Sequence, residues 1–184
     1  FIGSKNIKSL KLSELRKIIS YVPQNNFLFS ERIKKNIEFG NPNVSKDDVK
    51  KAAILSEIDS EIMKFDKGYD TILGERGVTL SGGQVQRLAI ARSFIKDSEI
   101  YLFDDCFSSL DTDTEDRIIK NLKNSFKDKT LLIVSHRVSC VKNADSIIVL
   151  ENGKIIQEGT HDLLIKIEGY HKELYNKQNN EINK

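Results

Sequence analysis

The chain has 184 residues, of which 39% are hydrophobic and 30% charged, so it can bury a core and is not disordered by composition. Its 29 basic residues nearly balance 27 acidic ones, for a formal charge of +2, so it lacks the overall basic field of a nucleic-acid-binding protein and we expect no nucleic-acid partner. Uninterrupted apolar runs stop at about four residues, whereas a membrane span needs roughly 20.

The chain opens on Phe1-Ile2-Gly3, which reads as a strand running into a turn and has no initiating Met before it. We therefore expect further residues upstream in the same protein. A second strand is predicted to end at Tyr21-Val22, because Pro23 breaks it and the amide of Gln24 follows.

A stretch without predicted strands follows. Residues 45–64 are expected to form one helix, since their apolar positions fall near helical spacing and Ser45 followed by Asp48 resembles a capped start. After a loop marked by glycines, residues 84–96 predict a second helix with Leu88 on its apolar side.

Two short apolar runs, residues 100–103 and 131–134, are typical of strands buried on both faces, and a helix is predicted between them at 112–126. A further strand is expected at 146–150, where Asn152-Gly153 then signals a hairpin into residues 154–157. Strands that alternate with helices imply an α/β fold with a mostly parallel sheet. From residue 169 the chain becomes steadily more polar, so we expect a short helix and then a frayed tail at 177–184.

The most specific motif is Leu80-Ser81-Gly82-Gly83-Gln84, which stands directly before a predicted helix. Backbone N–H groups at a helix N-terminus, with no Cβ in the way, form an anion site. For the Ser-Gly-Gly part alone, a simple helix cap after a flexible turn is the alternative.

Polar residues follow both buried strands. Asp104 and Asp105 end the first, at the edge where open α/β sheets bind ligands, so one carboxylate could hold Mg²⁺ and the other could orient or deprotonate water. For the two aspartates alone, the start of an ordinary turn is the alternative, but Ser108-Ser109-Leu110-Asp111 soon after adds weight to the ligand site. His136 follows the second strand and could reach a phosphate, whereas His161 and His171 are expected to be structural or solvated.

In this order and spacing, these elements resemble the ATP-binding domain of ABC transporters from about residue 1 to 175. The resemblance implies a partial P-loop NTPase (RecA-like) core with an α-helical subdomain, divided as 1–24, 25–92 and 93–176. It also implies roles for individual residues: Gln24 as the Q-loop, Ser81, Gly82, Gly83 and Gln84 in the signature motif, Asp104 as the Walker B magnesium ligand assisted by Gln24, Asp105 in the base position, Asp111 in the D-loop and His136 as the switch histidine.

Gly74-Glu75-Arg76-Gly77 is similar to the loop that is typical of exporters, including multidrug and lipid exporters. The resemblance therefore implies a transmembrane-domain partner reached through the Gln24 and Glu75 loops, a place at the cytoplasmic face of the cell membrane, and a second ATP-binding domain. In such a pair each ATP, with Mg²⁺, lies between one domain's Walker motifs and the other's signature, and hydrolysis drives export.

The first departure from the family is the absence of a G-x-x-x-x-G-K-[ST] loop, whose backbone amides wrap the phosphates. The family places this loop upstream of Phe1, so we expect it to be missing from this sequence and not lost in evolution. These 184 residues alone should then bind ATP poorly and hydrolyse almost none.

The second departure is Asp105, where the family usually has Glu. The shorter side chain moves the carboxylate by roughly 1 Å, a misplacement that can cost about 10²-fold in rate. We expect the weakened-base subunit of a heterodimer, whose intact signature completes the partner's site. The alternative is that Asp105 works after a small backbone adjustment.

Two other functions stay open. A soluble ABC ATPase of DNA repair or translation shares the site chemistry, but such proteins generally carry long insertions and lack the 74–77 loop. A non-hydrolytic nucleotide-sensing or dimerisation module is favoured by Asp105, while the retained Gln24, Asp104 and His136 argue against it. The two cysteines, Cys106 and Cys140, have no paired spacing and indicate a reducing compartment without a disulfide or zinc site.

Overall fold

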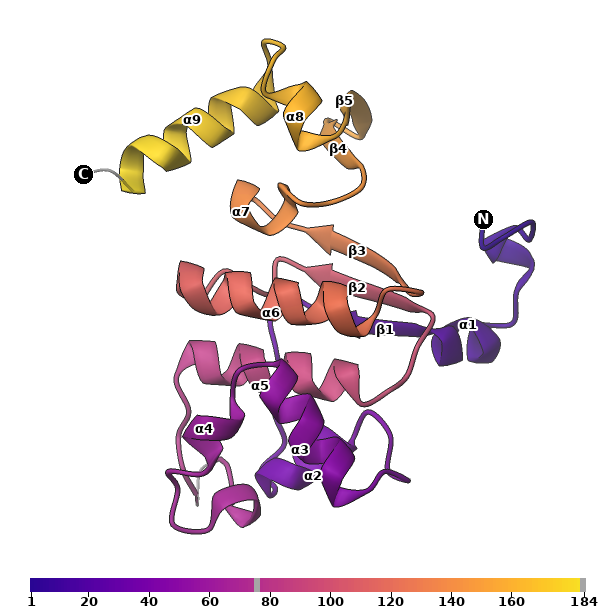
Figure 1. The fold of residues 1–184 in the computed structure, drawn as a ribbon. Helices are drawn as coiled ribbons and strands as arrows, with labels where there is room; N and C mark the ends of the chain where they lie inside the picture. Colours follow the sequence, from indigo (N-terminus) through magenta and orange to yellow (C-terminus); the bar gives the residue numbers. More distant parts are fainter. Residues whose placement is uncertain (75–76, 183–184) are drawn as a thin grey trace. The chain divides into compact units, whose positions relative to one another are not determined.

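A computed structural model describes residues 1–74 and 77–182 of the chain, the side chains of the last two excepted (Figure 1). The chain divides into two compact units, Phe1–Val134 and Ser135–Lys184. Among the described residues no helix has both the length and the apolar character that crossing a bilayer requires.

The first unit is built on a three-stranded parallel sheet. Its strands are β1 (Ile19–Val22), β2 (Ile100–Asp104) and β3 (Thr130–Val134), in that spatial order. Because all three strands run the same way, their carboxyl ends lie at one edge of the sheet. The predicted α/β class with a parallel sheet is confirmed.

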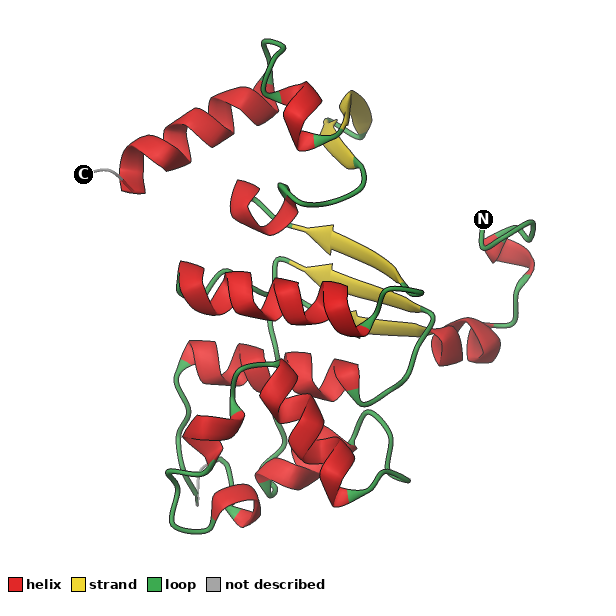
Figure 2. Cartoon of the chain, in the orientation of Figure 1, coloured by secondary structure: helices red, strands yellow, loops and turns green. Residues whose placement is uncertain are grey.

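Helices make up most of the rest of this unit (Figure 2). They are η1 (Ile7–Ser9), α1 (Leu12–Ile18), α2 (Ile33–Glu38), α3 (Lys46–Leu55), α4 (Asp59–Ile62), η2 (Gly68–Asp70), α5 (Gly82–Phe94) and α6 (Thr112–Ser125). In Figure 1, α2, α3 and α4 lie together on the side of α5 away from the sheet. They form a helical region between β1 and α5.

The single helix predicted at 45–64 is wrong, because the chain turns between α3 and α4. The predicted start is confirmed: Ser45 and Asp48 form a capping box. At the other end the N–H of Ile58 donates to the carbonyl of Ala53 at 2.9 Å, and Glu57 adopts a φ of 59°. This is a Schellman-type ending with Glu57 in the left-handed position that usually favours glycine. The buried Ile58 keeps helical spacing in the sequence although it follows the helix.

The core of the first unit gathers around β2. Tyr101 and Phe103 are buried and point to the same side of the strand, where Phe107 and Phe126 pack against them. The alternate residues on β2, Ile100, Leu102 and Asp104, are only half-buried, so the predicted burial of this strand on both faces is partly right. It is wrong for β3, which lies at the edge of the sheet and exposes Leu132 and Val134, each at 55%.

The second unit contains α7 (Val138–Val141), β4 (Ile147–Glu151), β5 (Lys154–Gly159), α8 (His161–Leu164) and α9 (Tyr170–Ile182). The predicted hairpin is confirmed: β4 pairs antiparallel with β5, and Asn152 and Gly153 both have positive φ, as a type I′ turn requires. These strands form a sheet of their own. Helix α9 continues to residue 182, so the fraying predicted from residue 177 is wrong for residues 177–182.

Two histidines pack together in this unit. The rings of His161 and His171 share a hydrogen bond of 2.9 Å between Nδ1 and Nε2, and Tyr175 stacks edge-on against His161. His171 is only 3% exposed, and its backbone N–H donates to Gln157. Burial, together with the neighbouring His161, lowers the pKa of His171 below 6.5. Of the two expected alternatives, His171 therefore has the structural role.

We predict that replacing Phe103 by Ala lowers the free energy of unfolding of the chain by about 3–5 kcal/mol, because it leaves a cavity between two other buried rings. Urea-induced unfolding measures this loss. The matched control is Leu132→Ala on the neighbouring strand, which should lose less than about 1 kcal/mol because its side chain is largely exposed. Similar losses for the two variants would contradict this core.

We also predict that His171 titrates below pH 6.5 in an NMR titration of its ring. The unfolded chain then binds more protons than the folded chain just below pH 6.5, so protonation of this residue destabilises the fold as the pH falls. In the His161→Gln variant the titration of His171 should move upward, because a neighbouring positive charge is lost. A midpoint at or above 6.5 in the wild type would contradict the assignment.

Candidate functional site

The glycine-rich segment before α5 forms a closed helix start. Ser81 is the N-cap: its Oγ accepts the N–H of Gln84 at 3.3 Å, while Gln84 Oε1 accepts the N–H of Ser81 at 2.8 Å. The first N–H groups of a helix have no carbonyl partner within it. Ser81 and Gly82 are exposed, so this N-terminal tip of α5, residues 81–84, presents backbone donors outward. The helix begins two residues earlier than predicted.

The tip lies directly against the turn at 108–111. A Cβ placed on Gly83 would come within 3.1 Å of the Ser109 carbonyl oxygen, and one on Gly82 would lie 3.7 Å from the Ser109 side chain. A side chain at position 83 would therefore push on the backbone of the turn. The glycine allows the close approach of the two segments.

Gln86, one turn further along α5, fixes this approach. Its side chain is buried; Nε2 donates to Ser108 Oγ at 3.3 Å, and Oε1 accepts the N–H of Ser109 at 3.0 Å. We did not predict this residue as part of the site. The available signal was a glutamine on the helix face shared with the buried Ala89 and Ile90, where an apolar residue is expected.

The carboxylate pair stands at the carboxyl edge of the sheet. Asp104 Oδ2 accepts the hydroxyl hydrogen of Tyr21 at 3.0 Å, and Asp105 Oδ2 accepts from Gln24 Nε2 at 3.0 Å. The hydrogen bond to Asp104, with a smaller effect of burial, raises the pKa of Tyr21. The structure thus brings the predicted Gln24, Asp104 and Asp105 together and adds Tyr21.

The backbone turns sharply at this pair. Asp105 has a φ of 45°, its N–H donates to the Val134 carbonyl at 2.8 Å, and its carbonyl accepts from Ser108 Oγ at 3.1 Å. These bonds hold a strained left-handed residue at the strand end, where such conformations often mark functional sites. They also connect Asp105 to the turn that touches the helix tip.

Asp111 begins α6 as its N-cap. Its Oδ1 accepts the N–H of Thr114 at 2.9 Å, and this bond is the first cause of the lowered pKa of Asp111. The side chain is exposed. Asp111 therefore has a structural role in helix capping as well as any role in the site.

Two predicted site residues belong to other parts of the chain. His136 lies in the second unit and is exposed. Its backbone carbonyl accepts a hydrogen bond from Gln178 Nε2 at 2.7 Å. Glu75 lies outside the described residues. Of its loop, Gly74 has a φ of 102°, a conformation that favours glycine.

The oxygen atoms of Gln24, Asp104 and Asp105 suit Mg²⁺ if phosphate and water supply its other ligands. Within the described residues no three His, Cys, Asp or Glu side chains converge as a complete metal cage. Asp104 and Asp105 offer carboxylate oxygens, and Gln24 has an amide oxygen left after its Nε2 bonds Asp105. Mg²⁺ typically takes one or two carboxylates and completes its shell with water and phosphate oxygens. These residues fit that pattern.

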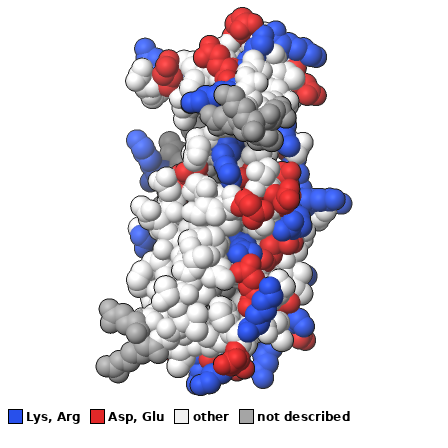
Figure 3. Space-filling model, turned by 90° about the vertical axis from the view of Figure 1, so that its left-hand side faces the viewer, with Lys and Arg blue, Asp and Glu red and all other residues white. Residues whose placement is uncertain are grey.

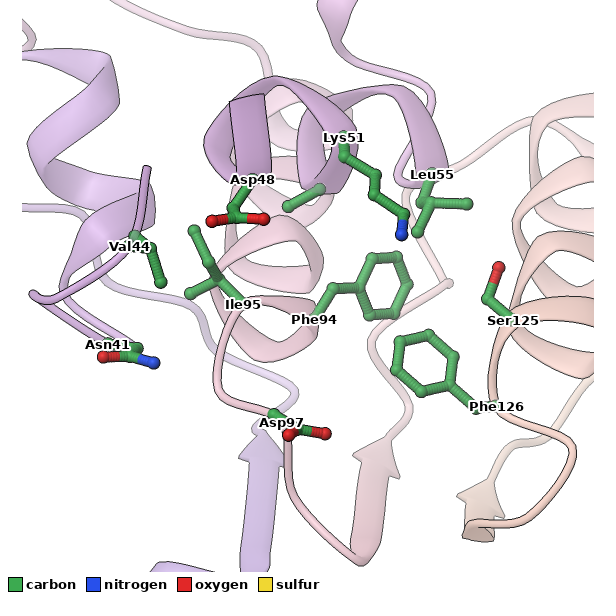
Figure 4. A pocket seen from close by; sticks show the side chains of 11 residues that line it. Asn41, Val44, Asp48, Lys51, Leu55, Phe94, Ile95, Asp97, Ser125 and Phe126 are labelled. Atoms are coloured by element: carbon green, nitrogen blue, oxygen red, sulfur yellow. The ribbon is translucent and has the colours of Figure 1, made fainter. Parts of the chain in front are cut away.

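A hollow of about 340 Å³ opens at the other end of α5 (Figure 4). Phe94 and Phe126 pack against each other in its wall, with ring centres 5.4 Å apart, and Asp48 and Lys51 also line it. Asp97, which also lines the hollow, precedes β2, whereas Asp104 ends that strand, so the hollow is distant from the carboxylate pair. It is not part of the candidate site.

The surface on the side of the tip carries few charges. In Figure 1 the strands β2 and β3 point toward the left-hand side, where α5 also begins, and Figure 3 looks onto that side. A broad area there has neither acidic nor basic side chains, and charges of both signs gather along one margin.

The chain is similar to known proteins over most of its length. The family model described as "ABC transporter" matches residues 1–108. The chain is 46% identical over 178 residues to the multidrug resistance-like ATP-binding protein MdlA of Buchnera aphidicola subsp. Schizaphis graminum, covering 96% of this chain and 30% of that protein. It is 41% identical to the mitochondrial iron-sulfur clusters transporter ABCB7 of Oryzias latipes, covering 99% and 24%.

A solved structure of a bacterial Atm1-family ABC exporter with ATP bound superposes with a TM-score of 0.90 at 35% identity, covering 97% of this chain and 31% of that one. The chain thus spans less than a third of the length of these relatives. By its family match, its similarity over nearly all residues and its fold, the chain belongs to the ABC transporter family.

Proposed function

We propose that the chain forms part of the ATP-hydrolysing domain of an ABC exporter, in which ATP-driven dimerisation and hydrolysis are coupled to export of a substrate across a membrane. The observation that carries this proposal is the exposed helix tip at Ser81 and Gly82, packed against the turn that follows Asp105. The relatives named as a multidrug resistance-like protein and an iron-sulfur clusters transporter support the same class of activity.

The tip acts across an interface with a second ATP-binding domain. Ser81 and the backbone N–H groups of Gly82 and Gly83 contact the γ-phosphate of an ATP held by that partner, at the positive end of the α5 dipole, while Gln84 closes the capping box with Ser81. The outward exposure of Ser81 and Gly82 supports a ligand that approaches from outside. The sparsely charged surface on this side supports a second protein there (Figure 3).

The carboxylate pair serves the ATP on this domain's own side. Asp104, with the amide oxygen of Gln24, holds Mg²⁺, which when bound neutralises charge on the phosphates. Asp105 stands in the base position, and the hydrogen bond from Gln24 fixes the direction in which its carboxylate points. Asp111 ends the turn that links this pair to the tip.

His136 hydrogen-bonds the γ-phosphate in this proposal, and Gln178 keeps its backbone in place. The loop that wraps the other phosphates is not among these 184 residues. Hydrolysis by the chain therefore requires residues beyond these 184.

A transmembrane domain docks near Gln24. Three exposed aromatic residues come after it in the chain, Phe27, Phe29 and Phe39. The Phe29 ring packs against the other two, and the guanidinium of Arg92 lies 5.5 Å from its centre. Such an exposed aromatic group is typical of a protein contact. Glu75 contributes from its loop, and the domain lies at the cytoplasmic face of the cell membrane.

Asp105 favours a second candidate, a domain that binds nucleotide and dimerises without hydrolysing it. In a heterodimer the two candidates combine: this chain's own site is slow, and its intact tip completes the partner's site. A soluble ATPase of DNA repair or translation is less well supported, because the similar proteins are transporters.

We predict that Asp105→Glu raises ATP turnover at this chain's own site by about tenfold to 10²-fold, because it returns the carboxylate to its expected reach. The measurement is ATP hydrolysis by the full-length transporter with its partner subunit, whose own site is inactivated. Asp128→Glu, an exposed conservative change elsewhere, is the control. An unchanged rate would contradict the idea of a weakened base.

We predict that Asp104→Asn lowers magnesium-dependent ATP hydrolysis by about 10²-fold or more, because the amide cannot hold the cation as the carboxylate does. Activity is measured against magnesium concentration in the full-length transporter. The Tyr21→Phe variant removes only the hydrogen bond to Asp104 and should retain most of the activity. If Asp104→Asn has no larger effect than Tyr21→Phe, Asp104 is not the metal ligand.

A further inference from the structure

We propose that Glu61, on the short helix α4, is a positioning residue that fixes the helix tip of α5 for contact with phosphate. The proposal rests on the function proposed above and goes beyond it, because Glu61 lies outside the signature motif. It is 23 residues before Gln84, in a segment that the sequence predicts only as helix.

The first step is the orientation of the Gln84 amide. Gln84 Nε2 donates to Glu61 Oε2 at 2.7 Å, and Gln84 Oε1 accepts the N–H of Ser81 at 2.8 Å. If the amide turned over, its NH₂ would face the N–H of Ser81 and its oxygen would face a carboxylate. Both contacts would be repulsive. Glu61 therefore selects the one orientation that closes the capping box.

The second step is the position of Glu61 itself. Arg87, on α5, lies 2.7 Å from Glu61 Oε1, and the same Nη1 donates to the Glu57 carbonyl at 2.7 Å. Arg87 Nε also donates to the Gly83 carbonyl at 3.3 Å. The guanidinium thus ties the Schellman turn, α4 and the first turn of α5 together. Its side chain is 13% exposed and that of Glu61 28%, so solvent competes weakly with these bonds.

The negative charge of Glu61 lies next to the positive charge of Arg87. A carboxylate close behind an anion-binding tip would repel phosphate unless a cation offset it, and Arg87 supplies that cation. Burial would raise the pKa of Glu61, but hydrogen bonds from Arg87 and Gln84 outweigh burial and lower it, so the ion pair persists at neutral pH. Glu61 then orients the tip without reducing its attraction for phosphate.

The tip consequently depends on α4 as well as on its own sequence. The turn around Glu57 sets where α4 begins, and α4 carries Glu61 to the tip. Arg117 of α6 also bonds Glu57, at 2.8 Å. Displacement of α4 would release the Gln84 amide and open the capping box.

The test uses the full-length transporter with its partner subunit, with ATP hydrolysis measured over a range of ATP concentrations. Glu61→Ala should lower kcat/KM for ATP about tenfold, the effect of losing one hydrogen bond to a charged group. Glu61→Gln keeps an acceptor for Gln84 and should lose less. Asp66→Ala, an exposed acidic change shortly after α4, is the matched control and should be unchanged.

A double-mutant cycle separates positioning from general stability. If Glu61 acts through Gln84, Glu61→Ala should add almost nothing in a Gln84→Ala background, whereas a purely structural loss should appear in full. The side-chain amide signals of Gln84 in an NMR spectrum should also shift in Glu61→Ala and not in Asp66→Ala.

Each outcome decides between the proposals. Additive losses, or a Glu61→Ala variant as active as the control, overturn the positioning role while leaving the proposed function intact. If Glu61→Ala fails to fold, the same cycle with Glu61→Gln decides whether Glu61 acts through Gln84. Absence of ATP hydrolysis in the wild-type transporter overturns the proposed function, and the positioning role with it.

Discussion

The arrangement of the first unit depends on one helix held at both ends. Helix α5 buries Leu88, Ile90 and Ala91 within the unit, so its axis cannot shift without opening the core. Its first turn is closed by Ser81 and Gln84, and Gln86 bonds it to the turn after Asp105. Its last residue, Phe94, stacks on Phe126. The same packing that stabilises the fold therefore sets the place of the tip.

The tip and the carboxylate pair serve two different nucleotides in the proposed function. The turn at 108–111 touches the tip on one side and is bonded to Asp105 on the other, through Ser108. A change at one site can reach the other through this turn. In the proposed function a chain with a weakened base at Asp105 would keep an intact tip, because the tip works for the partner.

The sequence predicted those parts of the site that depend on local spacing. The Ser81 to Gln84 segment, the strand ending in Asp104 and the hairpin at Asn152-Gly153 follow from residues that are near neighbours in the chain. Glycine, capping and turn preferences act over a few residues, so a sequence carries them directly. The family resemblance then indicated how the distant segments meet.

The parts that were missed depend on contacts between segments far apart in the chain. The break between α3 and α4 has a glutamate where glycine is expected, so the turn left no signal. Tyr21, Gln86 and Glu61 act through partners at least 22 residues away. Burial of β3 was overestimated because an apolar run does not reveal whether its strand is central or at the edge.

The central claim is that the α5 tip contacts the terminal phosphate of a nucleotide held by a second domain. Photocleavage by vanadate tests it directly, since vanadate trapped with ADP takes the place of that phosphate and breaks the backbone beside it on irradiation. We predict a break at Ser81 in the full-length transporter that depends on the presence of the partner domain. Breaks confined to segments outside residues 80–84, or a break at Ser81 without a partner, would contradict the claim.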